Sequence, residues 1–349
     1  MILPQSYSAA LILLFVALFL WGSWANTLKL VGRLRFELYY FDFAIGFLIT
    51  SVVVAFTLGS LGFDGFSLMD DLSHAGKRQW FYVFVAGIIF NFANMLLTAG
   101  ISVAGMAVSF PVSIGLSILV GSFIGLVTKR PDNGGLLAGG CLFILVSMIL
   151  IALANSLATV QRHEALARAG KAKSTRRPGS AKGVVLAAVS GLLMSAYFPL
   201  IQRGMEGELG LGPYATVMIF GIGVFISTFV FNIFFMNLSV EGDPVEIADY
   251  FRARPVLHIL GAMGGFMWAA AALCSLLALS TPGILRVSPA VQTWTRLGFP
   301  VIAALWGLVA WREFRGSDLR AKALACATIL LFALGLTLVS IAPLYLHKA

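Results

Sequence analysis

Ten long apolar runs occupy most of the 349-residue chain, and polar residues gather in the gaps between them. Each run is about 20 residues long, the length that a helix needs to cross a bilayer. The apolar residues follow one another without alternation, which indicates helices rather than barrel strands. The sequence therefore predicts an all-α polytopic membrane protein with spans at 8–28, 40–60, 80–99, 104–127, 135–157, 183–201, 214–237, 257–279, 287–311 and 321–344.

A basic gap at 160–182 separates the first five spans from the last five. Since five is odd, two such halves cross the membrane in opposite directions, which is typical of inverted-repeat transporters. Shifting the segment 86–111 by 178 positions matches Gly87 with Gly265, Ala93 with Ala271, Ser102 with Ser280, Gly105 with Gly283 and Pro111 with Pro289. We expect ten transmembrane helices as two inverted five-helix repeats: a first repeat at 1–159, a basic cytoplasmic linker at 160–182 and a second repeat at 183–349.

Lysine and arginine are unevenly distributed over the gaps. When alternate gaps are assigned to opposite sides, one side holds 16 of the 24 basic residues and the other side holds seven. Cytoplasmic loops retain positive charge, so we expect a cytoplasmic central gap and both termini outside, in a plasma or inner membrane. The formal net charge of +9 then reflects topology, and no motif around Arg176 and Arg177 indicates binding to nucleic acid.

The composition and motifs exclude several functions. Hydrophobic residues make up 59% of the chain and charged residues 11%, which leaves no room for a large soluble domain. Cys141, Cys274 and Cys326 lack the spacing of metal ligands, and no stretch has the G-x-x-x-x-G-K-[ST] pattern of a phosphate-binding loop. We expect no metal, no cofactor and no enzymatic activity, so that a gradient would drive any transport.

Polar residues inside spans are costly in lipid and usually face the interior of a helix bundle. Asn91 and Asn94 fall on one face of the third span, and Ser113 and Ser117 are one helical turn apart in the fourth. We expect all four to line a substrate cavity. For each serine, a hydrogen bond to its own helix is an equal alternative.

The ninth span carries Arg296 nine residues from its start and 15 from its end, with Gln292 one turn away on the same face. A guanidinium at this depth requires a carboxylate, helix carbonyls or a substrate oxygen as its partner. We expect Arg296 and Gln292 to contact the substrate. The alternative is a packed arginine bonded to loop carbonyls.

Asp42, at the start of the second span, is the deepest acidic residue that the sequence places in the membrane. A carboxyl group in apolar surroundings can exchange a proton near neutral pH, as a proton-coupled carrier requires. Asp42 is therefore the candidate for proton coupling. The alternative is an interfacial acid that pairs with Lys29, Arg33 or Arg35.

Aromatic side chains add three candidates for the substrate site. Trp268 lies in the middle of the eighth span, and Tyr197 precedes the proline that interrupts the sixth. Trp24 is the third, although Trp24 and Trp21 together are typical of an interfacial aromatic belt. A flat ring in a cavity suits a sugar or a heterocycle, and packing against a neighbouring helix is the alternative in each case.

Several of these stretches carry a family resemblance. The five-plus-five plan resembles the drug/metabolite transporter superfamily, and residues 20–24 (LWGSW), 40–43 (YFDF) and 55–59 (AFTLG) resemble the ureide permease family. Residues 109–116 (SFPVSIGL) are similar to the glucose/ribose porter branch of sugar transporters. The resemblance implies import of a ureide, nucleobase or sugar, commonly with protons. Unlike the long central loop of plant ureide permeases, the gap at 160–182 lacks a nucleotide-binding-like motif.

These observations lead to one functional hypothesis. We expect a secondary active transporter that imports a small neutral polar metabolite by alternating access, with the lipid bilayer, the solute and protons as its partners. The alternatives are a non-transporting membrane scaffold, a lipid-handling protein, or an exporter with the same fold. Gly121 and Gly125, or the pair at 139–140, can pack helices within one chain or in a homodimer.

Overall fold

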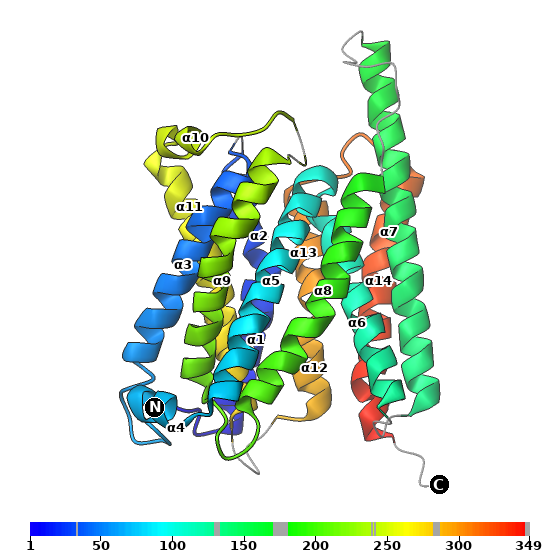
Figure 1. Ribbon diagram of the computed structural model, residues 1–349. Helices are drawn as coiled ribbons and strands as arrows, with labels where there is room; N and C mark the ends of the chain where they lie inside the picture. Colours follow the sequence, from blue (N-terminus) through cyan, green and yellow to red (C-terminus); the bar gives the residue numbers. More distant parts are fainter. Residues whose placement is uncertain are drawn as a thin grey trace. The chain divides into compact units, whose positions relative to one another are not determined.

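The computed structural model describes residues 1–32, 34–128, 133–169, 181–238, 240, 242–281 and 287–345. Every regular element in these residues is helical (Figure 1). Ten helices or helix groups are long and apolar enough to cross a membrane, which confirms the predicted all-helical, ten-span architecture. These spans are Tyr7–Leu30, Phe36–Phe56, Lys77–Ala104, Met106–Val127, Gly134–Arg168, Ala181–Met205, Pro213–Asn237, Pro255–Leu279, Pro289–Ala310 and Leu319–Leu344.

Local signals fix many helix ends. The side chains of Ser6, Asn133 and Asp318 each accept a hydrogen bond from a backbone N–H in the first turn of a helix. Pro213 and Pro255 begin helices, where a missing N–H costs nothing. The helices are α1 (Tyr7–Ser23), α2 (Ala25–Leu30), α3 (Phe36–Phe56), α4 (Leu68–His74), α5 (Lys77–Ala104), α6 (Met106–Val127), α7 (Gly134–Arg168), α8 (Ala181–Met205), α9 (Pro213–Asn237), α10 (Ile247–Arg252), α11 (Pro255–Leu279), α12 (Pro289–Leu297), α13 (Phe299–Leu305) and α14 (Leu319–Ile341).

Two elements differ from the expected pattern. Helix α7 continues to Arg168, well into the predicted linker, whose residues 170–180 lie outside the described part of the chain. The ninth span is not one continuous helix, because α12 ends at Leu297, α13 begins at Phe299, and a π-helix follows at Trp306–Ala310. The break has a physical cause: Pro300 has no N–H to donate to the carbonyl of Arg296.

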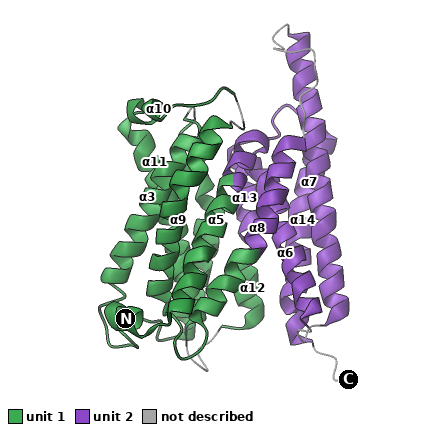
Figure 2. Cartoon of the chain, viewed as in Figure 1, with its two compact units in different colours: residues 1–95, 196–296 green, residues 96–195, 297–349 purple. Residues whose placement is uncertain are grey.

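The chain forms two compact units (Figure 2). Unit 1 contains Met1–Met95 and Ala196–Arg296, and unit 2 contains Leu96–Ser195 and Leu297–Ala349. Each unit takes whole helices from both halves of the sequence, for example α3 and α9 in unit 1 and α6 and α14 in unit 2. The two units therefore do not coincide with the two predicted repeats. The inverted relation of the repeats stays a prediction.

Helices of the two halves follow the same order at the offset of 178 residues, α3 with α9, α4 with α10 and α5 with α11. Inside unit 1, Gly87 of α5 lies against the carbonyl of Phe220 and Gly223 in α9. Correspondingly, Gly265 of α11 lies against the backbone of Phe43 and Phe47 in α3. A Cβ atom at either glycine would meet backbone atoms, so both pairs of helices approach closely only because these residues are glycine.

Glycine also brings helices together in unit 2. Gly140 of α7 lies against the carbonyl of Gly335 in α14, so this glycine packs helices within the chain. By contrast, a Cβ atom at Gly121 would have no described atom within 4 Å. Gly283 of the predicted repeat match lies outside the described residues.

Glu313 has a structural role in unit 2 that the sequence did not reveal. Its two carboxylate oxygens accept hydrogen bonds from the backbone N–H groups of Met106 (2.8 Å) and Ala107 (2.9 Å) at the start of α6. A carboxylate at a helix N-terminus satisfies unpaired donors and complements the helix dipole. Glu313 therefore ties the end of the ninth span to the fourth.

Candidate functional site

A narrow pocket lies inside unit 1, between α1, α8, α9 and α11. It has room for little more than a water molecule in this conformation. Most of its lining is aromatic or aliphatic, and Thr216, Ser275 and Tyr197 carry hydroxyl groups. The lining residues are Trp21, Tyr197, Phe198, Ile201, Thr216, Val217, Phe220, Trp268, Ala272, Ser275 and Leu276.

Trp268 is at the centre of the aromatic residues around this pocket. Its ring is parallel to that of Phe220, with an interplanar angle of 9° and centroids 5.9 Å apart. Its centroid lies 4.1 Å from that of Phe90 in α5 and 5.7 Å from that of Trp21 in α1. The structure thus brings two of the expected aromatic candidates, Trp268 and Tyr197, to one pocket.

Thr216 is the polar residue that distinguishes the pocket. Its side chain is fully buried, and its hydroxyl group has no hydrogen-bond partner among the described residues. Buried hydroxyls are nearly always paired, because leaving one unpaired costs about 1 to 3 kcal/mol. An unpaired hydroxyl in a pocket wall is positioned to bond a molecule that enters the pocket.

Arg296 lies beside the same pocket. Its guanidinium carbon is 3.8 Å from the ring centroid of Phe198, a cation–π contact with a residue of the pocket lining. Arg296 is in the last turn of the nine-residue α12, close to the break at Gly298. The prediction that Arg296 lies in the middle of a continuous helix is therefore wrong, because the helix that carries it ends at Leu297.

Gln292 and Trp24 have clear partners elsewhere. The amide nitrogen of Gln292 donates a hydrogen bond of 2.6 Å to the carbonyl of Val287, which closes the start of α12. The side chain of Trp24 is only 1% exposed, and its ring lies 5.3 Å from that of Phe43. The interfacial-belt interpretation of Trp24 and Trp21 is wrong, because both are buried in the protein.

Asn91 and Asn94 join helices of unit 1. The amide nitrogen of Asn91 donates to the hydroxyls of Ser227 (2.8 Å) and Thr228 (3.1 Å) in α9. That of Asn94 donates to the hydroxyl of Tyr40 in α3, at 3.0 Å. These side chains connect α5 with α9 and α3, and their place in a substrate site remains a prediction.

The predicted serines belong to unit 2. The hydroxyl of Ser113 in α6 lies 3.0 Å from that of Ser190 in α8, so it forms a contact between helices rather than a bond to its own helix. Ser117, one turn further along α6, is half-buried. Neither serine lines the pocket of unit 1.

Asp42 has partners that differ from those expected. Its carboxylate oxygens lie 2.5 Å from the hydroxyl of Tyr250 and 2.8 Å from Nδ1 of His258. Arg35, one of its expected partners, instead pairs with Glu37 at 2.7 Å, and Arg33 lies outside the described residues.

Comparison with known proteins finds a transporter with a similar sequence. The chain has the architecture of a polytopic α-helical membrane protein, and no family model matches it. It is similar to Ureide permease 1 of Arabidopsis thaliana, with 20% identity over 390 residues that cover 95% of this chain and 96% of that protein. Similarity to a permease and ten apolar helices together indicate a transporter rather than an enzyme. A solved structure described only as "Crystal structure of protein" is 16% identical, with a TM-score of 0.49 over 93% of this chain and 97% of that one.

Proposed function

We propose that this protein is a secondary active transporter that imports a small neutral polar metabolite by alternating access, coupled to protons. The observation that carries the proposal is the pocket of unit 1, which is lined by Thr216, with its unpaired hydroxyl, and by Phe198, against which Arg296 packs. The permease relative supports transport as the activity.

The chemistry of the pocket favours a planar ureide or nucleobase over a sugar. The parallel rings of Trp268 and Phe220 offer flat surfaces to a planar solute. A sugar carries hydroxyl groups around its whole ring and requires many polar partners, whereas Thr216, Ser275 and Tyr197 are the hydroxyl-bearing residues of this largely apolar lining. The guanidinium of Arg296 can donate hydrogen bonds to carbonyl oxygens such as those of a ureide.

The remaining site residues take supporting roles in this proposal. Asn91, Asn94, Ser113 and Gln292 hold helices in place through the hydrogen bonds described above. Asp42 belongs to the site that exchanges the coupling proton. The linker at 160–182 is cytoplasmic and both termini are outside, as the distribution of basic residues indicates.

Uptake by purified protein in proteoliposomes tests the proposal. Labelled allantoin, uracil and glucose are each offered with and without an inward proton gradient. We expect uptake of allantoin or uracil that rises with the gradient. Uptake of none of the three by wild-type protein would overturn the proposed function.

A matched pair of variants locates the site. Trp268→Leu removes the central ring of the pocket, and we expect a loss in uptake of about tenfold or more. Trp80→Leu changes a half-buried tryptophan at the start of α5 that does not line the pocket, and should retain uptake. Equal losses in both variants would contradict the assignment of the pocket.

A further inference from the structure

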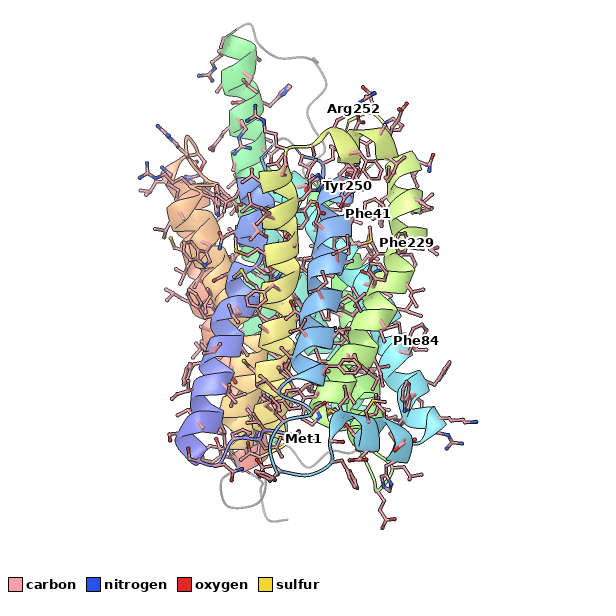
Figure 3. All side chains as sticks on the ribbon, turned by 90° about the vertical axis from the view of Figure 1, so that its left-hand side faces the viewer. Met1, Phe41, Phe84, Phe229, Tyr250 and Arg252 are labelled. Carbon is pink, nitrogen blue, oxygen red and sulfur yellow. The ribbon has the colours of Figure 1, made fainter. Side chains whose placement is uncertain are left out.

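Three titratable side chains from three different helices meet in unit 1, outside the aromatic pocket. Asp42 of α3, Tyr250 of α10 and His258 of α11 are joined by the two short contacts to the carboxylate of Asp42. The rings of Tyr250 and His258 also meet edge to face, with centroids 4.6 Å apart. Figure 3 shows Tyr250 beside Phe41, whose ring centroid is 5.6 Å away.

The protons in this cluster can be assigned from hydrogen-bond chemistry. Burial, the hydrogen bond to Asp42 and the charge of Asp42 raise the pKa of Tyr250, so its hydroxyl remains a donor. An ionised Asp42 accepts only, so Nδ1 of His258 must carry a hydrogen. Nε2 of His258 is then the ring nitrogen that can take up a second proton, and a quarter of this side chain is exposed.

We propose that Asp42, His258 and Tyr250 form a proton-binding site that fastens α10 and α11 to α3 when His258 carries its second proton. The bound proton turns the contact of 2.8 Å into an ion pair between imidazolium and carboxylate, which is stronger than a neutral hydrogen bond. Its release leaves a neutral histidine. The site deepens the proton coupling proposed for Asp42, but it can be tested without transport.

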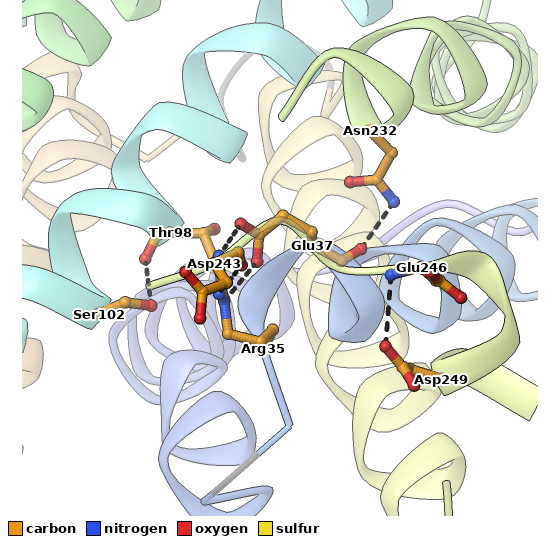
Figure 4. A network of polar contacts seen from close by, with 8 residues as sticks. All are labelled: Arg35, Glu37, Thr98, Ser102, Asn232, Asp243, Glu246 and Asp249. Carbon is orange, nitrogen blue, oxygen red and sulfur yellow. Dashed lines mark hydrogen bonds and ion pairs between the residues drawn. The ribbon is translucent and has the colours of Figure 1, made fainter. Parts of the chain in front are cut away.

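Among the described residues, Tyr250 and His258 contact the carboxylate of Asp42. On α3, Arg35 is bound to Glu37, and it also donates to the carbonyl of Asp243 (Figure 4). On α10, Asp249 and Arg252 face each other at 3.7 Å and are largely exposed. The other charged groups on packed elements are Lys29 of α2, the exposed Arg254 before α11 and Glu246 before α10, and α9 has no charged residue.

The corresponding helix of the first half gives an internal control. Helix α4 is also held by a buried aspartate, since Asp71 accepts hydrogen bonds of 3.1 and 3.0 Å from the backbone N–H of Gly212 at the start of α9. Burial raises the pKa of Asp71, but its bonded partner is an amide that does not titrate. Substitution of His258 should therefore alter the attachment of α10 and leave that of α4, which carries its own His74, unchanged.

Hydrogen-exchange mass spectrometry of the full chain in lipid nanodiscs tests this site. Exchange is measured at about pH 5.5 and about pH 8, on either side of the usual titration of histidine, and corrected for intrinsic rates. We expect α10 to exchange roughly tenfold faster at the higher pH, because a neutral hydrogen bond holds the helices less strongly than an ion pair does.

Variants separate titration from packing. His258→Asn places an amide nitrogen near the position of Nδ1 without a titratable group, so exchange of α10 should lose its pH dependence. His163→Asn, on α7 in unit 2, should retain the wild-type behaviour. Should His258→Asn fail to fold, His258→Gln also removes the titratable group and replaces it in the comparison. The pH dependence of the wild-type protein can be measured without either variant.

Two results would overturn the proposal: no pH dependence of α10 in the wild-type protein, or the same dependence in His258→Asn. These results are independent of uptake. Protein that transports nothing but shows pH-dependent attachment of α10 would refute the proposed function and leave the proton site intact.

Discussion

Thr216 and Thr228 lie on the same helix, α9, and both are buried. In the described residues, only the hydroxyl of Thr228 has hydrogen-bond partners. Thr228 donates to the carbonyl of Val224 at 2.8 Å and contacts the side chain of Asn91. Thr216 has no hydrogen-bond partner in the described residues and lines the aromatic pocket. About 18 Å of helix separates the two threonines. The region around Thr228 holds helices together, and the region around Thr216 forms the wall of the pocket.

Buried polar residues in the spans are therefore of two kinds. A buried polar group whose donors and acceptors are all paired mainly adds to helix packing. A buried polar group without a partner carries a cost in stability, which a bound ligand can offset. The difference between the two regions can be tested by four substitutions.

The largest effect is expected from Gly87→Ala, in the contact between α5 and α9. The added Cβ atom would meet the carbonyl oxygen of Phe220, so the helices must separate. We expect the free energy of unfolding to fall by about 3 kcal/mol, measured by denaturation in detergent. Gly121→Ala is the control and should be neutral, because no described atom lies within 4 Å of the added carbon. Equal stability of the two variants would disprove the close contact.

Asn91→Leu should have the next largest effect. The change removes the hydrogen bonds to Ser227 and Thr228 and leaves their hydroxyls with fewer partners. We expect a loss of about 2 kcal/mol in the same denaturation measurement. Asn237→Leu affects an exposed residue that bonds only the carbonyl of Ile233 in its own helix, and should change stability little. A wild-type stability for Asn91→Leu would mean that the bonded region does not hold α5 to α9.

Thr228→Val should cost about 1 kcal/mol. Valine has nearly the same shape as threonine, so the loss reports the hydroxyl rather than the packing. The double variant with Asn91→Leu checks the origin of the effect, because removal of a shared interaction makes the two losses less than additive. Fully additive losses would show that Thr228 and Asn91 act independently.

Thr216→Val should have the smallest effect on stability, and of the opposite sign. Replacing an unpaired buried hydroxyl by a methyl group removes a polar atom without breaking a hydrogen bond. We expect the melting temperature to stay the same or to rise slightly, by an amount equivalent to about 0.5 kcal/mol. A clear loss of stability would show that the hydroxyl has a partner inside the protein.

The spans could be predicted from the sequence because length and hydropathy alone limit how a chain crosses lipid. Gly87 and Gly265 were matched between the halves, and both mark close helix contacts. The break in the ninth span had a local signal in Gly298 and Pro300, which the hydropathy of the whole run concealed.

The candidate site was less predictable, because side-chain partners depend on distant residues. His258 lies 216 positions from Asp42, and no local pattern indicates that the two meet. Trp21 stands near the end of a span, where a belt residue and a pocket residue look alike in sequence. Thr216 resembles any threonine bonded to its own helix, and only the structure shows its hydroxyl unpaired.

The apparent KM for uptake by the Thr216→Val protein, compared with that of Thr228→Val, shows whether the transported solute binds in the pocket. With the solute that wild-type proteoliposomes take up, Thr216→Val should raise KM about fivefold, equivalent to about 1 kcal/mol for one lost hydrogen bond to the solute. Thr228→Val, although less stable, should keep the wild-type KM once the amount of folded protein is matched. An unchanged KM in Thr216→Val, or an equal rise in both variants, would contradict the assignment of the pocket to the transported solute.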